Sequence, residues 1–213
     1  MKLGGLRVVG AFVVVSAIVA LALNVAGVAP IPVGPMGDQR PALPDVASDT
    51  IDYAPIRDAE YLTALVENTG PLPVTVIRVT PIGTTVAGSV EVLGSLTFNS
   101  DDPAYLGPDG MPQITLGIQP DPGPAWANPD PISGVTVDPK GKAQYQGRAF
   151  LVRVTPDPVE KTVVLGFDVE YTMGPLHFVT TAWGPVGTTL VFCGRDRPLA
   201  ARTGMIDCTA ANE

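Results

Sequence analysis

The chain has 213 residues and a formal net charge of −8, from 21 acidic and 13 basic residues. That length suits one anchor plus one domain with a single core, and two full domains would be cramped. After residue 30 the chain carries all 21 acidic residues against 11 basic ones, a net charge of −10, which disfavours nucleic-acid binding.

An uncharged apolar run opens the chain, from Val8 to Ala29, with 22 residues. A helix of that length spans roughly 33 Å and can cross the hydrocarbon core of a membrane. Lys2 and Arg7 precede the run, whereas the first basic residue after it is Arg40. This asymmetry predicts a cell-membrane protein with a cytoplasmic N-terminus (1–7), a transmembrane helix (8–29) and an extracytoplasmic C-terminal domain.

A cleaved signal peptide remains the alternative for this run, because small residues at its end offer cleavage sites. Against it, the run exceeds the roughly 7 to 15 apolar residues of a signal peptide. In addition, Pro30 directly after Ala29 would hinder cleavage there.

Residues 30–49 hold prolines at short intervals and cannot propagate a helix. They predict an extended linker.

Short alternating segments follow the linker and predict an all-β domain over 50–192. The clearest alternation runs over 162–172, where apolar residues recur at every second position before a turn at Met173-Gly174-Pro175 and a returning strand from Leu176. We expect a β-sandwich of seven or eight strands. The other expected strands cover 61–67, 74–80, 90–98, 114–118, 150–154 and 188–192.

The segment from Leu65 to Val76 reads LVENTGPLPVTV. It resembles the early hairpin of bacterial extracytoplasmic immunoglobulin-like domains, in which a strand ends in an Asn-x-Gly turn and returns through a Val-x-Val strand. The resemblance implies an immunoglobulin-like β-sandwich and, where such domains have a role, adhesion, assembly or spacing at a cell surface. It implies no site residues, and this chain lacks the Cys, Trp, Cys order of antibody domains.

The stretch 99–148 is rich in proline and predicts long, ordered loops around one short strand. Loops of such length in a compact domain are commonly functional or disordered, and fixed proline φ angles favour the ordered alternative. Trp126 is the expected apolar anchor of an interaction surface there, with packing against the end of the sandwich as the alternative.

Cys193 and Cys208 are the only cysteines and predict a disulfide that closes the tail 193–213. Their spacing matches neither a Cys-x-x-Cys redox motif nor a zinc site.

No catalytic constellation is evident, so we expect no enzyme activity and no cofactor. His177 is the single histidine, and we find no Gly-x-Ser-x-Gly motif to supply a nucleophile. Met173 and His177 are too few ligands for copper, and the acidic loops lack an Asp-x-Asp-x-Asp-Gly calcium spacing.

The sequence therefore predicts a membrane-tethered sandwich that contacts a protein partner, as an accessory subunit or a surface spacer. Two alternatives stay open. One is a small-ligand or metal-binding domain that uses the loops of 99–148. The other is a hydrolase with carboxylates that the sequence does not identify.

Overall fold

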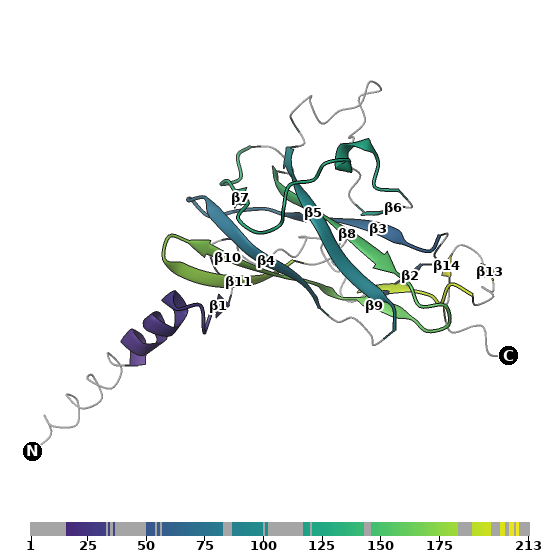
Figure 1. Cartoon of the computed structure of the whole chain (residues 1–213), viewed down its shortest axis with the longest axis horizontal. Helices are drawn as coiled ribbons and strands as arrows, with labels where there is room; N and C mark the ends of the chain where they lie inside the picture. Colours follow the sequence, from purple (N-terminus) through teal and green to yellow (C-terminus); the bar gives the residue numbers. More distant parts are fainter. Residues whose placement is uncertain are drawn as a thin grey trace, which may run out of the picture.

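The computed structural model describes residues 16–32, 34, 36, 50–53, 55, 57–82, 87–99, 101, 117–119, 121–142, 146–182, 189–196, 201, 202, 205, 206 and 208. Residues 16–25 form a helix at one end of the molecule, drawn in purple in Figure 1. Within these residues, no helix has both the length and the hydropathy that a membrane crossing requires. Positions 8–15 of the predicted span lie outside the described residues.

The described strands form three larger sheets and one small one (Figure 1). The five-stranded sheet has the order β1 (Ile31–Pro32), β11 (Leu176–Ala182), β10 (Gly166–Met173), β4 (Val74–Ile82) and β7 (Thr136–Val137). The four-stranded sheet has the order β5 (Ser89–Asn99), β8 (Gln146–Thr155), β3 (Glu60–Val66) and β6 (Gly117–Gln119). The three-stranded sheet has the order β2 (Thr50–Tyr53), β12 (Thr189–Phe192) and β9 (Thr162–Val164), and β13 (Ala201–Arg202) pairs with β14 (Met205–Ile206).

Two hydrophobic clusters lie between the four-stranded sheet and the other two large sheets. In the first, Val66 and Phe150 of the four-stranded sheet meet Val76, Val169 and Tyr171 of the five-stranded sheet. In the second, β3 and β8 meet β9, β10 and β12, through Leu62, Val152, Val164, Phe167 and Phe192. The chain is therefore an all-β protein whose sheets share a buried core, as its alternating segments predicted.

The strand pair predicted from the clearest alternation is confirmed from residue 166 onward, whereas 162–164 form β9 in the three-stranded sheet. Phe167, Val169 and Tyr171 of β10 are buried, while the residues between them are partly exposed. A two-residue turn, Gly174-Pro175, connects β10 to β11. Met173 and Leu176 pair on either side of this turn. Gly174 has φ 58°, a left-handed conformation that glycine adopts without a steric penalty.

The segment that resembles a hairpin is instead a crossing between sheets. Strands β3 and β4 do not pair, because β3 belongs to the four-stranded sheet and β4 to the five-stranded sheet. The Asn68 side chain holds this connection in place, since its Nδ2 donates to the carbonyl oxygens of Leu72 at 2.8 Å and Val137 at 2.9 Å. Gly70 N–H donates to Asn68 Oδ1 at 3.0 Å and completes the turn.

The predicted linker 30–49 also differs from expectation in its described part. Ile31 pairs in parallel with Phe178, which makes β1 an edge strand of the five-stranded sheet. Met36 is completely buried in the first core cluster. Proline prevents a helix here, but it does not prevent an edge strand or burial against a neighbouring sheet. The remaining positions, among them 37–49, lie outside the described residues.

Candidate functional site at the helix junction and the 121–142 strap

The helix is fixed to the sandwich by one polar side chain, Asn24. Its Oδ1 accepts the backbone N–H of His177 at 3.0 Å, and its Nδ2 donates to the carbonyl oxygens of His177 and Ala29. Asn24 is 2% exposed, whereas every other described residue of the helix is exposed. The Asn24 amide therefore makes the two hydrogen bonds with the His177 backbone that a neighbouring strand would make at the edge of β11. These bonds fix the position at which the helix leaves the domain.

A second contact ties the chain after the helix to the same sheet. The backbone N–H of Met36 donates to the Tyr171 hydroxyl at 3.2 Å. The Tyr171 ring stacks on Phe178, with ring centroids 5.5 Å apart. Burial raises the pKa of Tyr171, and the Met36 N–H partly opposes that rise. The junction is thus held both at the sheet edge and within the core.

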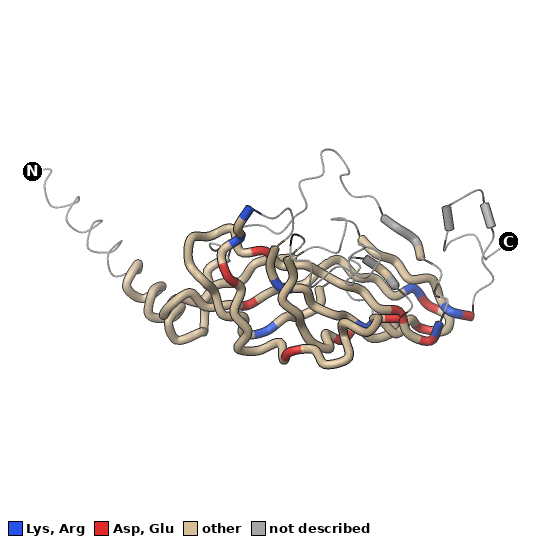
Figure 2. Tube along the Cα trace, turned by 90° about the horizontal axis from the view of Figure 1, so that it is seen from above, with Lys and Arg blue, Asp and Glu red and all other residues tan. Residues whose placement is uncertain are grey.

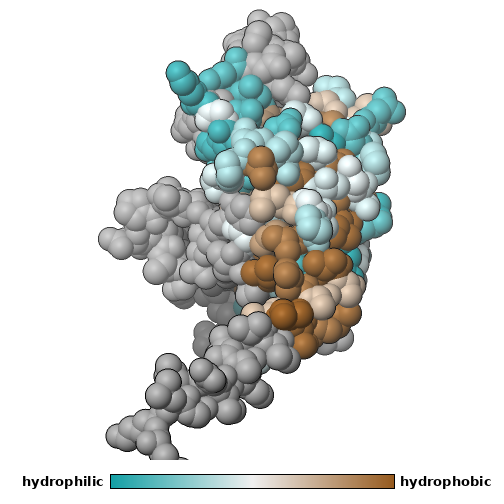
Figure 3. Space-filling view, turned by 90° about the vertical axis from the view of Figure 1, so that its left-hand side faces the viewer, coloured by the Kyte–Doolittle hydropathy of each residue, from teal (hydrophilic) through white to brown (hydrophobic). Residues whose placement is uncertain are grey.

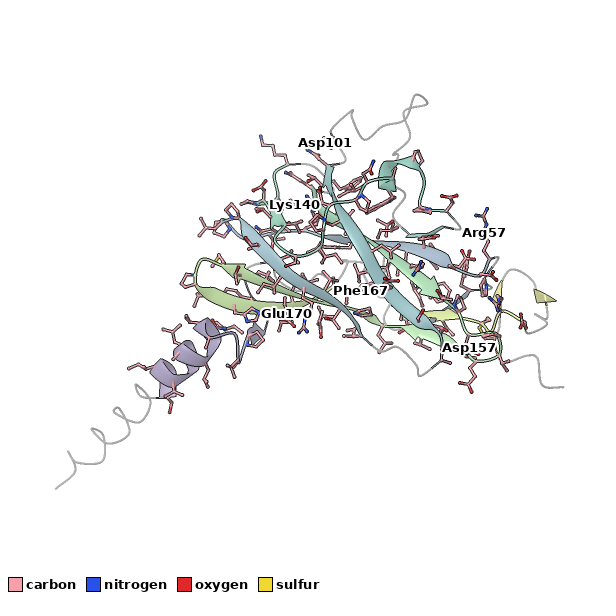
Figure 4. All side chains as sticks on the ribbon, in the orientation of Figure 1. Arg57, Asp101, Lys140, Asp157, Phe167 and Glu170 are labelled. Carbon is pink, nitrogen blue, oxygen red and sulfur yellow. A yellow bond between two sulfur atoms is a disulfide. The ribbon has the colours of Figure 1, made fainter. Side chains whose placement is uncertain are left out.

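The only histidine of the chain lies beneath this junction. His177 is 9% exposed, and neither ring nitrogen has a hydrogen-bond partner among the described residues. Its Nε2 is 3.6 Å from an oxygen of Glu170, whose carboxylate also pairs with Arg78. Figure 4 shows Glu170 on β10 at the side of the sheet from which the helix departs. The His177 imidazole and the Glu170 carboxylate thus lie side by side. No described hydroxyl or thiol, the groups that act as nucleophiles beside a histidine, is hydrogen-bonded to the imidazole.

The 121–142 segment, which we call the strap, passes along the edges of two sheets. It packs on the outer face of the four-stranded sheet through Trp126, and Asp130 then pairs with Ser95 at the edge of β5. Its last part forms β7 at the edge of β4, where Val137 pairs with Val74. Backbone groups of both edge strands are thereby paired, which blocks sheet extension at those positions. The rest of the predicted loop region, including 102–116 and 143–145, lies outside the described residues.

Trp126, the expected interaction anchor, is 5% exposed. It follows Gly123 and Pro124 in the short 3-10 helix η2 (Pro124–Trp126) and packs against Phe98, Ala149 and Leu151. Its indole Nε1 has no hydrogen-bond partner among the described residues. The structure therefore places this ring in a buried cluster that joins the strap to the four-stranded sheet.

A buried arginine beneath the strap was missed by sequence reasoning. Arg148 is 6% exposed and donates to Ser95 Oγ at 3.1 Å and to Thr97 Oγ1 at 2.7 Å. It also forms an ion pair with Asp130 of the strap. Charge-assisted contacts of this kind hold a loop in one geometry. The sequence signal was a charged residue directly before an apolar run, Arg148 before Ala149 to Val152.

The predicted disulfide between Cys193 and Cys208 is present, and the two residues are 15 positions apart. Both cysteines are buried and pack with Val191 and Val163 on the three-stranded sheet. The bond therefore fastens the tail to the sheet as well as closing a loop.

Among the described residues, the most deeply buried carboxylate is that of Glu60, at the opposite end of the sandwich. Its Oε1 accepts the backbone N–H of Arg57 at 3.2 Å. The Tyr53 hydroxyl is hydrogen-bonded to the Glu60 carboxylate. Burial and the negative charge of Glu60 raise the pKa of this hydroxyl. Among the described residues, no group of three or more His, Cys, Asp or Glu side chains is placed to hold a metal ion.

The fold and this set of contacts define an all-β protein with a helix fixed to one sheet edge and a strap along the opposite edges. No protein-family model, curated protein or solved structure matches the chain.

Proposed function

We propose that this chain is a non-enzymatic, membrane-tethered extracytoplasmic domain that presents a rigid β-sandwich to a protein partner. The observation that carries the proposal is the Asn24 contact, which fixes an apolar helix directly to the sandwich. A helix whose exposed residues are nearly all apolar suits a lipid environment. The helix exposes Ile18, Val19, Leu21, Leu23 and Val25.

Rigid attachment supports a role in positioning. If a domain only needed to be kept near a membrane, a flexible linker would suffice. Here the chain leaves the helix, pairs with β11 at Ile31 and enters the core at Met36. A fixed orientation suits an accessory subunit or a spacer, in which a surface must face its partner in a defined direction.

The strand order supports the immunoglobulin-like class. Counting β3, β4, β5, β8, β10 and β11 as strands B to G, the pairings β5-β8-β3 and β11-β10-β4 correspond to D-E-B and G-F-C. The parallel strand β1 at the edge of β11 adds to this pattern. Such sandwiches commonly act through surfaces and not through enclosed sites.

The strap is the surface we assign to the partner. Trp126 and the Arg148–Asp130 pair fix its backbone, so little conformational entropy is lost when a partner binds. Asn128 and Ser133 lie exposed on it. The contact surface is therefore made of the outward residues of the strap, with Trp126 supporting them from below.

Membrane attachment is tested by carbonate extraction of membranes from cells that produce the full chain. Retention in the pellet, together with protease digestion of the C-terminal domain in intact cells, is expected. Release into the supernatant, or protection of the domain from the protease, would contradict the proposal.

Partner contact is tested by cross-linking in the same cells. Ser133→Arg adds a bulky charge to the strap surface, and Val159→Arg adds the same charge at an exposed site outside the strap. We expect the first variant alone to lose its discrete cross-linked species. Equal cross-linking in both variants would remove the strap from the proposed function.

A further inference from the structure

We propose that the end of the sandwich next to the helix rests on the lipid surface, with the β3–β4 and β10–β11 connections at the boundary between headgroups and acyl chains. This inference rests on the proposed membrane attachment. It adds that the domain itself contacts lipid, through residues outside the helix.

Three connections meet at this end. The chain after the helix lies against His177, because Asn24 binds the backbone of that residue. The β10–β11 turn follows directly, since Met173 pairs with Leu176. The β3–β4 connection is adjacent, because Thr172 pairs with Thr75 near the start of β4 and Thr69 Oγ1 donates to the Met36 carbonyl oxygen at 3.2 Å.

The composition of these connections suits an interface with lipid. No Asp, Glu, Lys or Arg occurs in 24–32, in 69–77 or in 171–182. By contrast, the 156–161 connection at the opposite end contains Asp157, Glu160 and Lys161. Figure 4 shows Asp157 and Arg57 at the end of the domain far from the helix. The three connections beside the helix are thus uncharged themselves, and the nearest charged residues form the ion pairs Glu67–Lys140 and Arg78–Glu170.

Exposed apolar residues continue from the helix onto this end. Val28 is 70% exposed, Leu72 is 54% exposed and Ile31 is 38% exposed. In Figure 2 no charged residue lies on the described helix or on the chain that follows it. Figure 3 looks at this end of the molecule, and hydrophobic residues form one region there, with hydrophilic residues gathered above it. A continuous apolar surface of this kind marks an interaction site, and its continuity with the helix assigns lipid as the occupant.

The Asn24 contact fixes the orientation of the helix relative to this end of the sandwich. Because the helix cannot swivel about a flexible linker, the connections beside it stay next to whatever surface the helix enters. Leu72 and Pro175 then lie closest to the lipid, as exposed residues of the two turns.

The test compares single spin labels on the full chain in phosphatidylcholine nanodiscs. Leu72→Cys reports the proposed contact. Val159→Cys is the matched control, because Val159 is an apolar residue of similar exposure, 57%, beside Asp157 at the opposite end. Leu21→Cys reports the helix. Collision rates with oxygen, which concentrates in lipid, and with a water-soluble nickel chelate are measured for each label, after a thermal melt confirms that each variant folds.

We expect the oxygen-to-nickel ratio at position 72 to exceed that at position 159 several-fold and to approach the ratio at position 21. A lipid-like ratio at 21 with equal, water-like ratios at 72 and 159 overturns this inference and leaves the attachment standing. Water-like ratios at all three positions overturn both. A label at 72 that is shielded from both reagents indicates a second protein surface on this end, which also overturns the assignment to lipid.

Discussion

Replacing Trp126 by alanine measures how firmly the strap is held. The side chain is 95% buried against Phe98, Ala149 and Leu151, so its removal leaves a cavity on the outer face of the four-stranded sheet. Truncating a buried aromatic residue to alanine costs about 3–5 kcal/mol. Trp126 lies on an irregular segment that can partly collapse into the space, so we expect about 3 kcal/mol. For a domain of this size that cost lowers Tm by roughly 6–12 °C.

Urea unfolding is the assay, because it separates a loss of stability from a change in the unfolded state. A lower midpoint with an unchanged slope is expected for Trp126→Ala. Trp126→Phe is the matched control, and it should lose less than half as much, since the indole Nε1 has no hydrogen-bond partner to lose among the described residues. A cost below about 1 kcal/mol for the alanine variant, typical of surface positions, would refute the assignment of Trp126 to the core.

Three further predictions concern the tail, the junction and one loop. Cys193→Ser should cost about 3 kcal/mol, the value for a loop of roughly 15 residues in the chain-entropy model, and a melting curve of the unreduced protein that matches the wild type would contradict it. Asn24→Ala should speed hydrogen exchange of the His177 amide by about one to two orders of magnitude, since a buried unsatisfied group costs roughly 1–3 kcal/mol. Unchanged exchange would mean that other contacts hold the junction. The backbone N–H groups of Glu160 and Val159, with Arg195 nearby, lower the pKa of Asp157 below its ordinary value of 3.8. Ionised Asp157 therefore stabilises the fold above pH 3.8. This contribution is lost as the pH falls through the pKa of the folded state. Asp157→Asn should therefore be less stable than the wild type at pH 7, and the difference should shrink as the pH falls below 3.8. A difference that stays constant as the pH falls would contradict this.

Regular alternation predicted the strands well, because side-chain direction repeats every two residues and one face of each strand meets the core. It located β5, β8, β10, β11 and β12 within a few residues. The two cysteines predicted their own bond, since the chain offers no other pairing.

The contacts of irregular segments were not predictable in this way. Met36 lies 135 positions from Tyr171, and Asn24 lies 153 positions from His177. The alternation of apolar and polar residues carries no information about a partner so far along the chain. A proline-rich composition is also the same in a free linker and in an edge strand. Asn24 did leave one signal, as the single amide in an apolar run. A polar group there requires a hydrogen-bond partner, and the partner proved to be the backbone of β11.

The parallel pairing of β1 with β11 has a consequence for biosynthesis. Ile31 emerges early, but its partner Phe178 is translated about 150 residues later, which takes on the order of ten seconds at ribosomal elongation rates. Strand β2 waits in the same way for β12. During that interval the first strands of the domain have no neighbour within their own chain, and other newly made copies compete for the same backbone groups. Strands β1 and β2 are thus synthesised first but obtain their partners only when most of the chain has been made.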